Sequence, residues 1–101
     1  MKEVLTVLGP LPDPGHTGTF PNAVYEWCVN TTAFDPSTSS ALVNSEDGHL
    51  YRWNLTTNTL SQSVLLDGPR GQAYTPTVTG PTGIVYAINN AKIFAVGANA
   101  P

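Results

Sequence analysis

The side chains best suited to chemistry lie within and directly after a stretch rich in proline and glycine near the N-terminus. His16 stands within residues 11–22, and Tyr25, Glu26 and Trp27 follow that stretch. Aromatic rings beside a carboxylate can bind a sugar, because the rings stack on its apolar face and the carboxylate accepts hydrogen bonds. The same residue types also pack between sheets. They therefore indicate either a site for a carbohydrate or small molecule, or a proline-rich spacer with structural aromatics.

Two further ligand-binding candidates, Arg70 and Tyr74, follow a second Gly-Pro turn. Gly68-Pro69 ends an extended apolar run, as Gly9-Pro10 does near the N-terminus. The loop after Gly9-Pro10 is the longer of the two, and extra length in a loop suggests a use in binding. We therefore place Arg70 and Tyr74 with the N-terminal candidates as residues of one ligand-binding surface.

The other reactive residue types form no recognisable site. His49 is the only other histidine, and the acidic residues do not cluster to complete a metal site. Glu46 and Asp47 precede a glycine, where acids are common for backbone reasons and a calcium site is the weaker interpretation. No serine lies in a Gly-x-Ser-x-Gly pattern, and Cys28 is expected to be a small buried apolar residue. We expect no catalytic residue, no metal and no cofactor.

The composition is that of one β-rich domain without a polyanionic partner. Charged residues make up 11% of the 101 residues, which is too few for solvated helices, while Thr, Val, Asn, Gly and Pro are plentiful. The net charge is −3 and no cluster of Lys and Arg exists to neutralise phosphates. We therefore expect no binding to nucleic acid and none to an anionic membrane.

The N-terminus predicts no targeting segment. The apolar run after Met1 is short and ends at Gly9-Pro10, so it predicts neither a signal peptide nor a membrane span. We expect a cytoplasmic protein, or a secreted one if the sequence is a piece of a longer chain. The single cysteine, Cys28, excludes an intrachain disulfide.

A β-hairpin over residues 41–55 organises the chain. Ala41 to Asn44 is an apolar run, Glu46-Asp47-Gly48 is a turn in which glycine accepts positive φ, and His49 to Leu55 alternates with period two. Further strands are expected at Glu3–Leu8, Ala23–Phe34, Leu60–Leu66, Gln72–Thr79, Ile84–Ile88 and Lys92–Val96. Pro76 places the strand Gln72–Thr79 at a sheet edge or bulge. Asn58 suits a left-handed turn position, and Leu11–Asn22 is expected to be irregular.

The C-terminal hairpin repeats the first one at a gapless offset of 43 residues. Ala41-Leu42-Val43 then falls on Ile84-Val85-Tyr86, and Leu50-Tyr51-Arg52-Trp53 on Ile93-Phe94-Ala95-Val96. Each apolar residue of the first hairpin falls on an apolar residue of the second, and Arg52 falls on Ala95. A repeat of this length is typical of sheets stacked in an array.

These residues resemble blades of the WD-repeat and quinoprotein-like β-propellers. In those blades an Asp-Gly turn leads into an apolar strand that ends near Trp-Asp. Asp47-Gly48 and Trp53 match the pattern, while Asn54 stands in place of the second Asp. The resemblance implies an all-β, propeller-like chain of two four-stranded antiparallel blades, circularly offset so that the N-terminal strand closes a C-terminal blade. It also implies that the loops with His16 and Arg70 gather at one end of a central channel.

The resemblance divides the single module into four segments. These are a closing strand (1–10), a loop insertion (11–22), a first blade (23–67) and a second blade (68–101). Two blades cannot close a ring, since propellers need about four to eight. We expect a homo-oligomer, preferably a trimer or tetramer, with a dimer as the smallest closed form. The expected function is non-catalytic binding or assembly. The alternative is a C-terminal fragment of a larger quinoprotein-like or hydrolase propeller enzyme.

Overall fold

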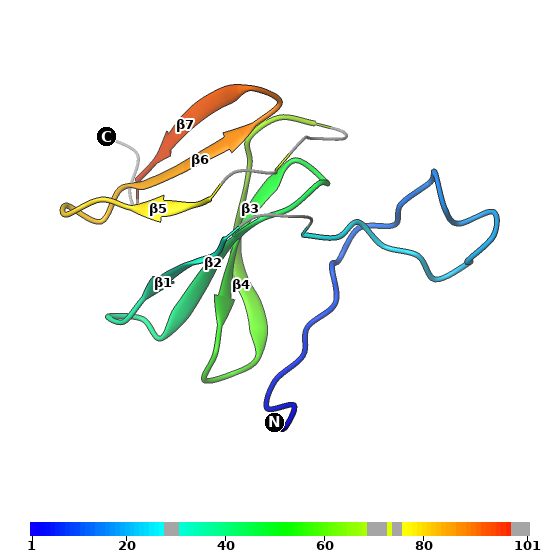
Figure 1. Cartoon of the computed structure of the whole chain (residues 1–101), viewed down its shortest axis with the longest axis horizontal. Coiled ribbons are helices and arrows are strands. Elements are labelled where there is room, and N and C mark those ends of the chain that lie inside the picture. Colours follow the sequence, from blue (N-terminus) through cyan, green and yellow to red (C-terminus); the bar gives the residue numbers. More distant parts are fainter. Residues whose placement is uncertain (28–30, 69–72, 74–75, 98–101) are drawn as a thin grey trace.

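The computed structural model describes residues 1–27, 31–68, 73 and 76–97. Within these ranges the chain forms seven β-strands and no helix, so the all-β prediction is confirmed (Figure 1). The strands form two antiparallel sheets, one of four strands in the order β1-β2-β3-β4 and one of three in the order β5-β6-β7. The described residues contain no helix that is long and apolar enough to cross a membrane.

The first sheet contains the predicted organising hairpin. Its strands are β1 (Ala33–Asp35), β2 (Ser40–Asn44), β3 (His49–Asn54) and β4 (Thr59–Leu65). Gly48 adopts a φ of 89° in the β2–β3 turn, and a Cβ atom there would lie 1.6 Å from the carbonyl oxygen of Asp67. Only glycine fits, because that oxygen belongs to the backbone that follows β4. Asn58 has a φ of 54° in the β3–β4 turn, as predicted.

The second sheet contains the predicted closing hairpin but is one strand narrower than expected. Its strands are β5 (Val78–Thr79), β6 (Val85–Asn89) and β7 (Lys92–Val96). β5 lies at an edge, as a preceding proline predicted. Positions 72, 74 and 75 of the predicted Gln72–Thr79 strand lie outside the described residues. Within the described residues the two sheets therefore have four and three strands, where two of four were expected.

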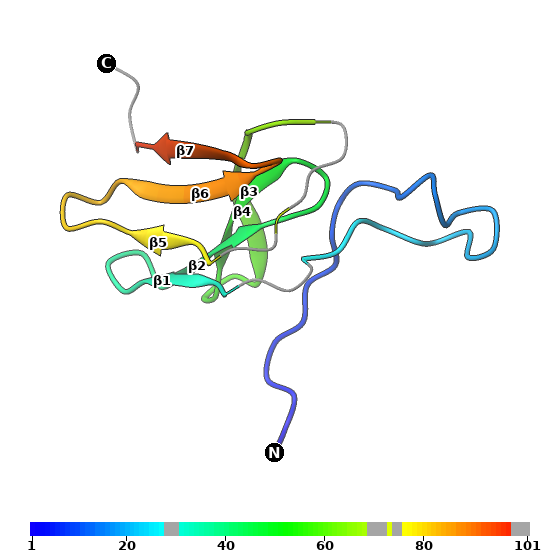
Figure 2. The same ribbon diagram turned by 45° about the horizontal axis from the view of Figure 1, so that its top comes forward.

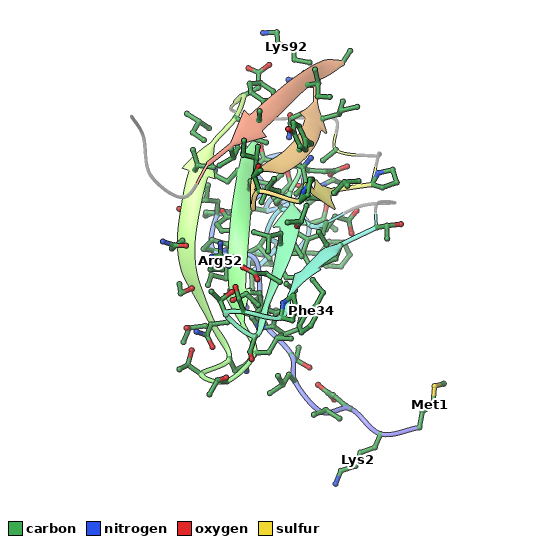
Figure 3. All side chains as sticks on the ribbon, turned by 90° about the vertical axis from the view of Figure 1, so that its left-hand side faces the viewer. Met1, Lys2, Phe34, Arg52 and Lys92 are labelled. Carbon is green, nitrogen blue, oxygen red and sulfur yellow. The ribbon has the colours of Figure 1, made fainter. Side chains whose placement is uncertain are left out.

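The N-terminal segment does not complete the second sheet of its own chain. Residues 3–8 form no strand, and Val4 and Leu8 are 82% and 75% exposed. The Thr6 carbonyl instead accepts a hydrogen bond of 3.0 Å from the side chain of Asn58. Figure 3 shows Met1 and Lys92, which begins β7, at opposite ends of the molecule. Within one chain this segment therefore does not pair with β7, and its closing of a C-terminal blade stays a prediction for the blade of another copy.

Corresponding strands of the two sheets run in the same direction, and the corresponding ends of these strands lie together. They approach most closely along β1 and β5, which lie side by side (Figure 2). The amide of Thr77, directly before β5, donates to the carbonyl of Thr31, just before β1, at 2.8 Å. At the same end, the side chain of Asn44 in β2 donates to the carbonyl of Ile88 in β6 at 2.8 Å. The two sheets are therefore stacked in the same orientation. The face of the first sheet that carries Leu42, its front, meets the face of the second sheet that carries Val85, its back.

The core between the sheets decides which residues of the two hairpins correspond. Leu42 and Leu50 of the first sheet pack against Val85 and Ala87 of the second. Since front meets back, the counterpart of Leu42 is not Val85 but Tyr86, its neighbour on the opposite face. The expected offset of 43 residues holds for β3 and β7 but is one residue too short for β2 and β6. A shift of one residue reverses every side chain of a strand, so this register depends on the packing.

Candidate functional site

The predicted loop of residues 11–22 is irregular, as expected, and projects from the sheets (Figure 1). Hydrogen bonds from Asp13 N to Ala23 O and from Tyr25 N to Leu11 O, of 3.1 and 3.0 Å, join its two sides. The Nδ1 atom of His16 lies 2.7 Å from Oδ2 of Asp13, and the His16 side chain is 59% exposed. His16 is thus held by a carboxylate of its own loop.

Tyr25, Glu26 and Trp27 lie where their segment crosses the turn of the first hairpin. The carbonyl of Glu26 accepts a hydrogen bond of 3.0 Å from the amide of Glu46. Tyr25 is buried and the Glu26 side chain is exposed. Trp27 packs against the buried residues on the back of β2 and β3, with its ring centroid 5.8 Å from that of Trp53. Of the two interpretations offered for Trp27, packing is the one that its contacts show.

A shallow cleft of about 250 Å³ lies beside these residues. Its walls are Val7, Leu8 and Gly9 on one side and residues 24–27 on the other. A small ligand in this cleft would contact Tyr25, Glu26 and Trp27, but His16 is not among its lining residues. The candidates Arg70 and Tyr74 lie outside the described residues, so the predicted second loop has no place in this geometry.

A buried carboxylate, Asp47, organises the turn of the first hairpin. Asp47 is 2% exposed and accepts hydrogen bonds from the hydroxyl of Tyr51 and from the amide of His49, the latter at 2.8 Å. The Nδ1 atom of His49 lies 3.2 Å from the same carboxylate, and the rings of His49 and Tyr51 stack with centroids 5.6 Å apart. Sequence reasoning placed these residues in a hairpin but missed their contact. Their period-two spacing, which puts His49 and Tyr51 on one face, was the available signal.

This cluster is suited to holding a turn rather than to reacting with a substrate. Burial raises the pKa of the Tyr51 hydroxyl above its usual value of 10.0, and the hydrogen bond to the negatively charged Asp47 raises it further. A tyrosine that keeps its proton is a hydrogen-bond donor to Asp47. Among the described residues, no group of three or more His, Cys, Asp or Glu side chains could hold a metal ion.

A second polar cluster crosses the front face of the first sheet. The Nη1 atom of Arg52 donates to Oδ2 of Asp35 at 3.0 Å and to Thr38 at 2.7 Å, and Nε donates to Gln62 at 2.7 Å. Hydrogen bonds from Ser37, Thr38 and Arg52 lower the pKa of Asp35 from 3.8 to about 2. These bonds join the β1–β2 turn to β3 and β4.

The space between the two sheets widens toward their outer strands. A cleft of about 220 Å³ is lined by Leu50, Gln62 and Val64 from the first sheet and by Val85 and Val96 from the second. The first sheet extends one strand further than the second. The cleft thus lies between β3 and β4 of the first sheet and β6 and β7 of the second.

The chain matches no protein-family model and no curated protein sequence. Its function therefore has to be inferred from the arrangement of the two sheets and from the surfaces that this arrangement leaves open.

Proposed function

We propose that this chain is a non-catalytic β-propeller-type module that assembles as a homo-oligomer and offers a loop face for a ligand. The observation that carries the proposal is the front-to-back packing of the two sheets, with their first strands, β1 and β5, side by side. Propeller blades stack in this way, because each sheet is rotated about a central axis lined by first strands. The hydrogen bond between Thr77 and Thr31 sits at that inner edge.

The N-terminal segment is the fourth strand of a neighbouring copy's second sheet in this proposal. Residues 3–8 precede β1 as β4 precedes β5, and a Gly-Pro pair follows each of them, at Gly9-Pro10 and Gly68-Pro69. Among the described strands β7 pairs only with β6, which leaves its outer edge for another strand. The cleft beside Val64 and Val96 lies where side chains of an added strand would enter.

Aligning the two Gly-Pro pairs also gives a register for the added strand. By analogy with the pairs Leu50–Val64 and Tyr51–Ser63 in the first sheet, Leu5 would lie opposite Ile93, and Val4 opposite Phe94. Both pairs are apolar, which favours this register on a twisted sheet.

Ring size follows from the number of blades that a propeller needs. With two sheets per chain and about four to eight blades in a closed ring, a trimer or tetramer is preferred and a dimer is the smallest ring. The cleft lined by residues 24–27 is then a ligand site for a carbohydrate or another small molecule, with Tyr25 and Glu26 as its polar contacts.

The mass in solution tests the assembly. Light scattering coupled to size exclusion should give one discrete mass of three or four chains, and deletion of residues 1–8 should lower it because the added strand is lost. A single-chain mass for the full sequence at high concentration would overturn the proposal. A broad, heterogeneous mass would favour a piece of a larger propeller enzyme instead.

A glycan array tests the loop face. Trp27→Ala would disturb packing as well as binding, since Trp27 contacts the buried back of the first sheet. Glu26→Gln is the sharper change, because the Glu26 side chain is exposed and its carbonyl contact is retained. Binding that falls for Glu26→Gln while the assembly mass stays constant supports the site. Absence of binding by the wild type, or equal binding by both chains, contradicts it.

A further inference from the structure

One face of the second sheet is apolar and open. The cross-strand pairs Val78–Tyr86, Tyr86–Ala95 and Ile88–Ile93 set five apolar side chains on the side turned away from the first sheet. We call this set the outer face; its members are Val78, Tyr86, Ile88, Ile93 and Ala95. Val78, Tyr86 and Ile93 are 55%, 40% and 71% exposed. An antiparallel sheet that meets water normally carries polar residues on that side, so this face is suited to a partner.

The packing inside the chain identifies what kind of surface covers such a face. In the register set by the core, Tyr86 corresponds to Leu42 and Ile93 to Leu50. Leu42 and Leu50 are each only 4% exposed, because the back of the following sheet covers them. The outer face of the second sheet therefore corresponds to the front face of the first sheet, which the back of the second sheet covers.

The back of the first sheet is a second surface of the kind that covers the front of a neighbouring sheet. The cross-strand pairs Phe34–Ala41, Ala41–Trp53 and Trp53–Leu60 line it. We call this set the back face; it comprises Phe34, Ala41, Trp53 and Leu60. Ala41 is buried, and Trp53 and Leu60 are half-buried in the cluster that Trp27 joins, while Phe34, toward the β1 edge, is 58% exposed. Exposed aromatic area of this kind is typical of the anchors of protein interfaces.

The position of the N-terminal segment agrees with this docking. Asn58, which donates to the Thr6 carbonyl at 3.0 Å, also accepts a hydrogen bond of 3.0 Å from Nε1 of Trp53, a member of the back face. The segment thus lies beside the back face, where the outermost strand of an incoming sheet would lie. An incoming β7 would meet the segment there edge to edge.

We infer that the outer face of one copy packs on the back face of the next copy, so that the interface between chains repeats the packing of the two sheets within a chain. This interface is head-to-tail, with different residues on its two sides, as a ring of identical subunits requires. The inference rests on the proposed function and names the surfaces that join the subunits.

Paired substitutions on the two sides test it. Ile93→Glu on the outer face and Phe34→Glu on the back face should each reduce the assembly to single chains, because each buries a charge at the interface. A 1:1 mixture should recover dimers, since the Ile93→Glu copy keeps its back face and the Phe34→Glu copy keeps its outer face. Thr82→Glu, at an exposed position of the β5–β6 turn, is the matched control and should keep the wild-type mass.

The outcomes separate this inference from the proposed function. A wild type of single-chain mass overturns both. A wild-type assembly that survives both charge substitutions overturns the docking alone. Dissociation of both variants without recovery in their mixture also overturns it, because the intact outer face of one copy and the intact back face of the other would then fail to bind. Far-ultraviolet circular dichroism checks that the variants stay folded. If Ile93→Glu unfolds, Ile93→Thr, which keeps the strand preference, should still raise the dissociation constant at least about tenfold.

Discussion

The two sheets share one hairpin design but differ in how much of it is covered. All five residues of β2 are buried, whereas β6 alternates between buried and more exposed positions. At corresponding positions, Leu42 is 4% exposed and Tyr86 is 40% exposed. Both residues are large and apolar, so the strand sequence does not cause the contrast. Burial here is set by the place of a sheet in the stack: the second sheet has one covered face, while the first has a covered front and a back that Trp27 covers in part.

The turns of the two hairpins also differ, and again the first is held by more side-chain contacts than the second. In the first, the buried Asp47 ties His49 and Tyr51 to the turn. In the second, Asn90 and Ala91 make the turn with φ values of 52° and 62°, and the residue that corresponds to Tyr51 is Phe94, which has no hydroxyl. The first turn is therefore fixed by packing and side chains, and the second chiefly by its backbone.

The largest expected effect contrasts two glycines with nearly the same φ. Gly48→Ala should cost at least about 4 kcal/mol of unfolding free energy or prevent folding, because its Cβ would meet the Asp67 carbonyl at 1.6 Å. Gly83→Ala, at a φ of 86° with no atom within 4 Å, should cost only about 1 kcal/mol for backbone strain. Urea denaturation at one fixed protein concentration measures both. Gly18→Ala, also with open space, is the control, and equal losses at Gly48 and Gly83 would contradict the close packing of the first turn.

A smaller effect contrasts the polar groups of the two turns. Asp47→Ala should cost about 3 kcal/mol, because it removes several hydrogen bonds and leaves the buried Tyr51 hydroxyl without its acceptor. Asn90→Ala should cost about 1 kcal/mol, since alanine is less suited to positive φ and the side-chain bond to Asp67 is long, at 3.4 Å. The same urea titrations measure this difference. A loss at Asn90 as large as that at Asp47 would show that both turns depend on side chains alike.

The sequence predicted the hairpins well because their signals are local. Alternation of apolar residues with Asp47-Gly48 or Asn90-Ala91 between two runs placed β2, β3, β6 and β7 within one or two residues. Residues 3–8 have the same strand-like composition but form no strand, because a strand needs a partner and this segment pairs with none of the described strands. Local pattern shows that a segment can pair, not with what.

The candidate site was less accessible to sequence reasoning. Tyr25, Glu26 and Trp27 could be read as ligand contacts or as packing residues, and for Trp27 the position against Trp53 shows packing. The one-residue change in repeat offset was hidden for a similar reason, since both faces of β6 are apolar. The Asp47–Tyr51 contact, by contrast, was visible in the spacing of the residues.

The smallest expected effect concerns the charge pair that the second sheet lacks. Asp35 and Arg52 correspond to Gly80 and Ala95, so only the first sheet has this link between its first turn and β3. The pKa of Asp35 is lowered in the folded state to about 2 from 3.8, which means that its ionised form stabilises the fold. This contribution is present above pH 4 and is lost as the pH falls from about 4 to about 2. Asp35→Asn should therefore flatten the decline of the urea midpoint across that window.

Asp67 provides the matched comparison on the side of the second sheet. Its pKa is also lowered, first by the hydrogen bond from Asn90 and further by the charge of Lys92, so it contributes with the same sign, and the contribution is lost as the pH falls below about 4. Asp67→Asn should flatten the pH profile less than Asp35→Asn, because Asp35 gains three side-chain donors, whereas Asp67 has the Gly68 amide at 3.0 Å, the long bond from Asn90 at 3.4 Å and the Lys92 amine at 3.4 Å. If the two profiles flatten equally, the extra polar link of the first sheet does not distinguish the sheets in stability, and the contrast between them reduces to the covering of their faces.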